Sequence, residues 1–166
     1  IEHDHKYLVN RNPSDFKDFK APPQFIINKE FYSSAKAVFC QSQKHKEVLE
    51  SNLKIGNVHS LSCSLWSQEQ IDTIRNSLCE KNGKAFVMND KNPIKGTDKA
   101  IAICETKGIE YDVVDKMPYP DFIKKLAKYD KFVFFPKTLE SFSRVILEAR
   151  MLGCRLVTNK LNSCTY

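Results

Sequence analysis

The sequence lacks any long apolar segment. No window of its 166 residues approaches the roughly 18 consecutive apolar residues that a membrane-spanning helix requires. The opening residues, IEHDHKYLVN, contain no basic stretch followed by an apolar core, which is the pattern of a signal peptide. They also lack an initiator Met, so we expect a fragment from the middle of a longer protein.

Closely spaced cysteine pairs are absent as well. The six cysteines are Cys40, Cys63, Cys79, Cys104, Cys154 and Cys164. Because several of them lie within or beside apolar runs, we expect reduced and mostly buried thiols in a cytoplasmic protein. The sequon-like stretch Asn12-Pro13-Ser14 is blocked by its proline, which fits the same compartment.

No stretch rich in Lys and Arg carries interleaved aromatic residues, so the sequence does not predict nucleic-acid binding. The net charge is nevertheless +6, from 26 basic and 20 acidic residues. A charge of this size fits a solvated surface, an anionic ligand or peripheral contact with an acidic membrane surface, and charge alone does not choose among them.

Short apolar runs rich in β-branched and aromatic residues predict buried strands. These runs lie at 36–40, 85–89, 111–115, 131–135 and 154–158, with a weaker one at 57–61. Helical patterns lie between them, at 42–52, 67–80, 96–108, 120–129 and 141–153. The serines at the start of the first two patterns predict N-caps, Thr97 predicts a third, and Gln70 completes a capping box with Ser67.

From residue 84 onward, strands and helices alternate. This order predicts a Rossmann-like α/β fold, with a parallel sheet and helices on both faces. We interpret 84–166 as one such domain, truncated after its fourth strand. Residues 1–62, a loop rich in Pro and charge followed by a strand–helix–strand unit, predict the tail of a preceding α/β domain, and 63–83 predicts a connector.

Two glutamates flank the start of the last predicted helix. Glu140 follows the strand at 131–135, at the sheet edge where open α/β sheets bind ligands. We expect the helix to begin near Ser141, so that its first-turn amides suit a phosphate. Glu148, about 12 Å further along the axis, would then accept hydrogen bonds from hydroxyl groups at the other end of a diphosphate ligand. Alternatively, Glu140 is an acid favoured by the helix dipole and Glu148 is a surface residue.

A second loop, Asn89 to Gly96, follows another strand of the same predicted sheet. Its Lys91 and Lys95 would neutralise phosphates at the same edge, unless they are simply solvated.

The stretch TLESFSRVILEARMLGCRLVTN resembles the E-x7-E segment of retaining GT-B glycosyltransferases of family 4, whose usual form is E-G-F-G-x-x-x-x-E-A-x-x-x-G-x-P-V-V. The matching positions are Glu140, Phe142, Glu148, Ala149, Gly153 and Val157. Lys95-Gly96 resembles the Lys-Gly of that family's donor loop, and the resemblance covers roughly 34–160.

The resemblance implies a nucleotide-diphosphate sugar as donor, with no metal and no other cofactor required. Glu140 would act as the catalytic residue on the transferred sugar, and Glu148 would bind the ribose. The other implied donor-binding residues are Lys91, Lys95, Gly96, Lys116, Met117, Ser141, Phe142, Ser143 and Arg144.

Among these residues, the resemblance places Lys95 at the diphosphate and Lys116 with Met117 at the base. The family usually has Gly-Arg before Lys-Gly, where this chain has Asn89-Asp90. Lys91 or Arg144 would then supply the missing positive charge.

The segment EHDHKY, at 2–7, permits three interpretations. It is a polar loop, a metal site formed by His3, Asp4 and His5, or a segment whose His3 and Asp4 face the donor sugar across a cleft. We expect the isolated His45 and His59 to be surface and strand-end residues. The aromatic residues between 16 and 32, together with Trp66, either stack on a sugar or pack loops onto the core.

We therefore expect a glycosyltransferase of the hexosyltransferase type, present here as a fragment. It would move a sugar from a nucleotide-diphosphate sugar to a carbohydrate or lipid-linked acceptor with retention of configuration, in the cytoplasm or at the cytoplasmic face of a membrane. The alternative is a non-catalytic α/β module that binds a nucleotide or phosphate. The sugar, base, acceptor and oligomeric state are left open.

Overall fold

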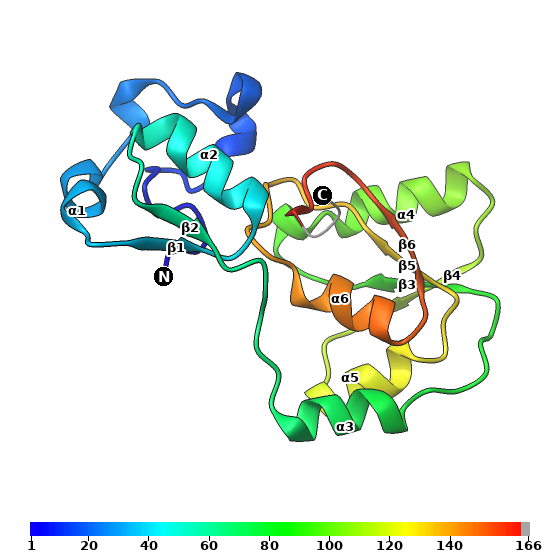
Figure 1. The fold of residues 1–166 in the computed structure, drawn as a ribbon. Helices are drawn as coiled ribbons and strands as arrows, with labels where there is room; N and C mark the ends of the chain where they lie inside the picture. The colour runs from blue at the N-terminus through cyan, green and yellow to red at the C-terminus, as the bar shows by residue number, and fades with distance from the viewer. Residues whose placement is uncertain (164–166) are drawn as a thin grey trace. The chain divides into compact units, whose positions relative to one another are not determined.

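The computed structural model describes residues 1–163, and Figure 1 traces the chain through them. The chain forms two compact units. The first unit contains Ile1–Ser64, Thr138–Ser143 and the residues from Lys160 on. The second unit contains Leu65–Lys137 and Arg144–Asn159. Each unit is described separately.

Two predictions about composition can be compared with the described residues. Five cysteines are free; Cys40, Cys104 and Cys154 are buried, whereas Cys63 and Cys79 are exposed. Cys164 lies outside the described residues. No helix within residues 1–163 is long and apolar enough to cross a membrane.

The first unit contains a small parallel sheet. Strands β1 (Val38–Cys40) and β2 (Val58–Ser60) pair with Val38 opposite Val58, and helix α2 (Gln43–Leu53) connects them. The unit also contains helix α1 (Lys29–Ser34) and the 3-10 turns Pro13–Asp15, Lys17–Phe19 and Pro23–Phe25. The predicted strand–helix–strand unit and the loop-rich segment before it are confirmed.

Helix α2 begins at its predicted cap, because the Ser42 side chain accepts a hydrogen bond from the His45 N–H. Its apolar face, which includes Leu49 and Leu53, is fully buried against the sheet and Tyr7. Aromatic side chains of the preceding loop, such as Phe16, pack against the same core. Phe16 and Tyr32 therefore contribute to packing, whereas Phe31 is exposed.

The second unit contains a four-stranded parallel sheet in the order β4-β3-β5-β6. Its strands are β3 (Ala85–Met88), β4 (Tyr111–Val114), β5 (Lys131–Phe134) and β6 (Arg155–Thr158). Each lies within a predicted apolar run, and all their pairings are parallel. The prediction of an α/β fold with parallel strands is therefore confirmed, and the architecture is compatible with a Rossmann-like fold.

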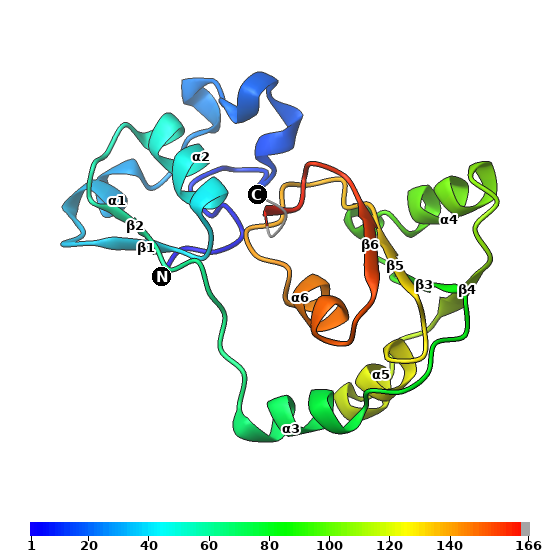
Figure 2. The same cartoon turned by 45° about the vertical axis from the view of Figure 1, so that its right-hand side comes forward.

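Helices cover both faces of this sheet (Figure 2). Helix α4 (Thr97–Thr106) packs on β3 and β5, where Ala85, Val87 and Val133 point toward it. Helices α5 (Tyr119–Leu126) and α6 (Arg144–Met151) lie on the opposite face. There, the ring of Phe86 contacts Phe122 of α5. Because side chains alternate between the faces of a strand, the central strands β3 and β5 supply both cores.

Helix α3 (Gln68–Asn76) packs on α5 and begins with the predicted capping box of Ser67 and Gln70. The residues from 65 onward, expected to form a connector, thus belong to the second compact unit.

The predicted start of α6 at Ser141 is wrong, since the helix begins at Arg144. The backbone of the residues just before α6 forms hydrogen bonds with residues 161–163. The Glu140 N–H donates to the Leu161 carbonyl at 2.9 Å, and the Ser163 hydroxyl donates to the Ser141 carbonyl at 2.8 Å. Glu140 also forms a parallel bridge with Asn162. The bond from Ser163 occupies the Ser141 carbonyl, which would accept an intrahelical N–H in a helix starting at Ser141.

Candidate functional site

The strand order places a switch point within the second unit. The chain runs from β3 to β4 on one side, then returns past β3 to β5 on the other. In open parallel sheets, the crevice at the carboxyl ends of strands beside such a reversal is the usual ligand site. Here, the loops that leave β3 and β5 meet at this edge.

Gly96 allows these two loops to approach each other closely. Its φ of +67° lies in the left-handed region, and a Cβ atom at this position would lie 1.9 Å from the Phe135 carbonyl oxygen. The Lys137 N–H donates to the Ile94 carbonyl at 2.8 Å, which joins the same loops. Only glycine satisfies both the left-handed φ and the close approach, so the structure explains the glycine at position 96.

The Thr97 side chain fixes the first part of the β3 loop. Its hydroxyl donates to the Met88 carbonyl at 2.8 Å and accepts from the Asp90 N–H at 3.1 Å. Thr97 is therefore the first residue of α4 and not its cap, a correction to the sequence analysis; Gly96 occupies the cap position. Between these anchors, Lys95 ends the 3-10 turn Pro93–Lys95 and is half-buried.

A cleft of about 400 Å³ opens at the carboxyl ends of β3 and β4. It is lined by Asn89, Lys91, Asp115 and Lys116. The Asn89 amide donates to Asp115 at 2.6 Å, and the Lys116 ammonium lies 3.6 Å from Asp90. The structure thus brings together two lysines that were predicted separately, from loops 25 residues apart, and Met117 follows them as a half-buried residue.

Glu148 is a buried carboxylate and not a surface residue, since only 4% of it is exposed. The Trp66 indole N–H donates to its Oε1 at 3.0 Å, and the Tyr119 hydroxyl donates to the same oxygen at 3.2 Å. The Arg144 guanidinium lies 3.6 Å from Oε1. The surface alternative for Glu148 is therefore wrong, because the carboxylate is paired and hydrogen-bonded as burial of a charge requires.

The Arg144 side chain connects Glu148 to the start of α3. Its guanidinium lies over the Trp66 ring, 5.1 Å from the centroid, and donates to the Gln70 side chain at 3.3 Å. Burial, followed by the Glu148 carboxylate, raises the pKa of Tyr119 to about 12. Tyr119 therefore stays protonated and can donate to Glu148 at neutral pH.

Sequence reasoning did not identify Tyr119 or Gln70 as site residues, and it considered Trp66 only as an aromatic. Tyr119 opens a helix at the carboxyl edge of the sheet, where open parallel sheets usually bind ligands, and this position could have marked it. The contact between Trp66 and Glu148 spans 82 residues of sequence, and no local pattern predicts it.

Glu140 belongs to the first unit, whereas Glu148 belongs to the second. Glu140 and Phe142 are half-buried, and Ser141 and Ser143 are buried. Around them, the Ser42 hydroxyl donates to the Ser141 carbonyl at 2.8 Å.

These residues precede α6, so the prediction that amides 141–143 form its first turn is wrong. The first unit anchors this segment through other bonds. The Ser141 hydroxyl donates to Gln41 at 3.0 Å, and the His5 ring N–H donates to the Leu139 carbonyl at 3.1 Å.

The polar residues of the N-terminal segment differ in how far they are buried. His3 and Asp4 are exposed and contact each other at 2.9 Å. His5 is 1% exposed, and burial lowers its pKa to about 4. Residues 1–163 contain no group of three or more His, Cys, Asp or Glu side chains that could hold a metal ion.

His45 is fully buried, which corrects the expectation of a surface residue; His59 is exposed on β2, as expected. The rings of His45 and His5 are 4.7 Å apart between centroids. Neither ring nitrogen of His45 has a hydrogen-bond partner among the described residues.

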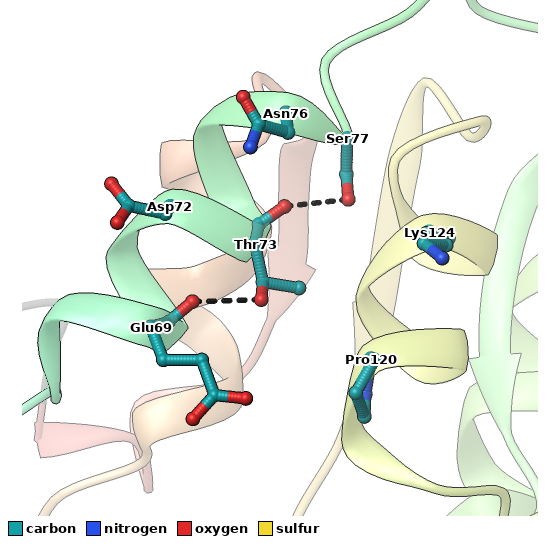
Figure 3. Close-up of a pocket in the computed structure, with 7 residues that line it drawn as sticks. All are labelled: Glu69, Asp72, Thr73, Asn76, Ser77, Pro120 and Lys124. Atoms are coloured by element: carbon teal, nitrogen blue, oxygen red, sulfur yellow. Dashed lines mark hydrogen bonds between the residues drawn. The ribbon is translucent and has the colours of Figure 1, made fainter.

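A second hollow, of about 670 Å³, lies between α3 and α5 (Figure 3). It is lined by Glu69, Asp72, Thr73, Asn76, Ser77, Pro120 and Lys124. The two hydroxyl groups are already used within α3, because Thr73 donates to the Glu69 carbonyl and Ser77 to that of Thr73. None of the residues predicted from the sequence lies here, so the cleft beside β3 and β4 is the better candidate.

Comparison with known proteins adds no assignment: no family model matches the chain, and no curated protein matches it.

Proposed function

We propose that the chain is part of a retaining glycosyltransferase of the GT-B type, which uses a nucleotide-diphosphate sugar as donor. The observation that carries the proposal is the lysine-lined cleft at the carboxyl edge of a parallel sheet, beside a glycine-tightened loop. Lysine ammonium groups at such an edge suit the phosphates of a nucleotide.

Tyr119 connects this cleft to a group that suits a sugar hydroxyl. Lys116 lines the cleft, and Tyr119, three residues later, donates to the buried Glu148 carboxylate. A carboxylate is an acceptor for ribose hydroxyl groups. The diphosphate would lie against Lys91 and Lys95, the base against Lys116 and Met117, and the ribose against Glu148.

The chemistry would depend on orientation and on stabilisation of the leaving diphosphate by lysine side chains. The role of Glu140, contact with the transferred sugar, follows from the resemblance of its sequence segment. We assign no nucleophile and require no metal or other cofactor. The acceptor would be a carbohydrate or a lipid-linked molecule, and the reaction would take place in the cytoplasm.

The alternative is nucleotide binding without transfer. It is favoured by Asp90, which lies 3.6 Å from the Lys116 ammonium at a position where the resemblance leads us to expect arginine. An acid at this position reduces the net positive charge available to a diphosphate.

Calorimetric titration of the full chain with UDP, GDP and ADP tests both proposals. We expect one of them to bind, and Lys91→Ala to weaken it about tenfold through loss of a charge-assisted contact. Lys107→Ala is the matched control, because this exposed lysine ends α4 at the opposite edge of the sheet.

Absence of saturable binding by all three ligands would contradict both functions. Binding without release of nucleoside diphosphate from the corresponding UDP-, GDP- or ADP-sugar would favour the alternative.

A further inference from the structure

We infer that Trp66 and Tyr119 are positioning residues that hold Glu148 for recognition of a ribose hydroxyl, an inference that rests on the proposed nucleotide-sugar donor. Neither residue would contact the reacting atoms. Their effect would be exerted through the orientation of one carboxylate.

The contacts of the Glu148 carboxylate are concentrated on one of its two oxygens. The indole N–H of Trp66, the hydroxyl of Tyr119 and the nearest Arg144 nitrogen all lie closest to Oε1. Within residues 1–163, these donors leave Oε2 as the oxygen for an incoming hydroxyl. Two donors on one oxygen restrict the orientation of the carboxylate, which favours a single binding geometry.

The donors are themselves held in place. Trp66 directly precedes Ser67, whose side chain caps α3 and whose own N–H donates to Gln70 at 2.9 Å. The Arg144 guanidinium covers the Trp66 ring and donates to the same Gln70 side chain. The capping box of α3 therefore restrains the indole ring that restrains Glu148.

Tyr119 contributes from a different element. It is the first residue of α5 and follows the loop that supplies Lys116 to the cleft. A shift of this loop on ligand binding would therefore be transmitted to Glu148 through the Tyr119 hydroxyl. Trp66, just before α3, and Tyr119, at the start of α5, approach the same oxygen, so loss of either one loosens the carboxylate without removing it.

The test measures preference for ribose hydroxyl groups, a quantity that a purely structural role would leave unchanged. Calorimetry on the full chain compares UDP, GDP and ADP with their 2′,3′-dideoxy counterparts. For the base that binds, we expect about a tenfold preference for the ribose form, as for a hydrogen bond to a charged group. Glu148→Gln should remove most of this preference.

Tyr119→Phe removes the hydroxyl donor and retains the ring, and Trp66→Phe removes the indole N–H and replaces the indole with a smaller aromatic ring. We expect each to reduce the preference several-fold, with affinity for the dideoxy form unchanged. Tyr111→Phe is the matched control, since Tyr111 lies on the edge strand β4 and its hydroxyl donates to the exposed Glu105 carboxylate of α4. It should keep the full preference.

Unchanged preference in both Trp66→Phe and Tyr119→Phe would overturn the inference and leave the proposed function intact. Absence of binding by all six ligands would instead overturn the proposed function, and the inference with it. Trp66 is the sole tryptophan of the chain, so its fluorescence verifies the fold of the Tyr119→Phe variant. That variant alone suffices if Trp66→Phe does not fold.

Discussion

The two units differ in how they accommodate left-handed backbone. Among residues 1–163, every non-glycine residue with positive φ, from Asp4 to Ser62, lies in the first unit. The glycines with positive φ, which are Gly83, Gly96, Gly108 and Gly153, all lie in the second unit. A side chain in this region costs roughly 1–2 kcal/mol, a cost that glycine avoids. The second unit thus avoids a strain that the first unit contains.

The units differ also in the polar groups they bury. The first unit contains all the histidines, and it buries two of them in contact with each other. The second unit buries a carboxylate, Glu148, that is matched by three donors. A buried histidine is favoured in its neutral form, because a protonated ring is unfavourable in an apolar core. Acid should therefore destabilise the first unit through its two buried histidines.

Substitution of Gly96 by alanine should have the largest effect. Its Cβ atom would overlap the Phe135 carbonyl oxygen, so the loops after β3 and β5 would have to separate. We expect Gly96→Ala to lower the free energy of unfolding by more than about 4 kcal/mol. Urea unfolding followed by Trp66 fluorescence measures this loss in the second unit.

Gly108→Ala is the control for Gly96→Ala, because Gly108 has a similar φ of +62° but no atom within 4 Å of the added Cβ. It should cost only about 1 kcal/mol, from backbone strain. Equal losses in the two variants would show that the loops do not require close approach at Gly96.

Acidification should destabilise the first unit selectively. Burial lowers the pKa of His5 to about 4 and that of His45 to about 3, against 6.5 in the unfolded chain. Below pH 6.5 the unfolded state takes up protons that the folded state does not, so stability falls from there toward pH 4 for His5 and pH 3 for His45. At pH 5 the loss is about 2 kcal/mol for each histidine.

Hydrogen exchange resolved by peptide measures this acid sensitivity separately in each unit. We expect faster exchange at pH 5 in α2, after correction for intrinsic rates, with little change in β3. His45→Leu should reduce the acid sensitivity, because it removes one of the two buried titrating rings. The substitution breaks no hydrogen bond among the described residues, because neither ring nitrogen of His45 has a partner there. His59→Gln should leave it unaltered, since His59 is exposed. Acid sensitivity that persists in His45→Leu at its original size would assign it to other groups.

Each unit contains features that could be predicted from local sequence patterns. Strands such as β3 and β5 were predictable because a parallel strand buried on both faces is apolar throughout. The buried His45 was also predictable, since it shares a helical stripe with Val48, Leu49 and Leu53.

Other features depend on partners that are distant in sequence. The late start of α6 follows from bonds between residues 140–141 and 161–163, which compete with helix formation. The environment of Glu148 follows from Trp66, 82 residues earlier. Helix propensity and spacing describe a single segment, so neither carries information about such competition.

The smallest expected effect comes from exchanging glycine and non-glycine residues at the left-handed positions that follow one helix in each unit. Lys54 ends α2 with a φ of +57° and is exposed, so Lys54→Gly should stabilise the first unit by about 0.5–1 kcal/mol, the relief of left-handed strain less the entropy of glycine. Gly108→Ala, just after α4, should shift the second unit in the opposite direction. The measurement is hydrogen exchange of α2 in one variant and of α4 in the other. Destabilisation by Lys54→Gly would show that the lysine side chain contributes more than its backbone strain costs, and that the first unit is not strained at this helix end.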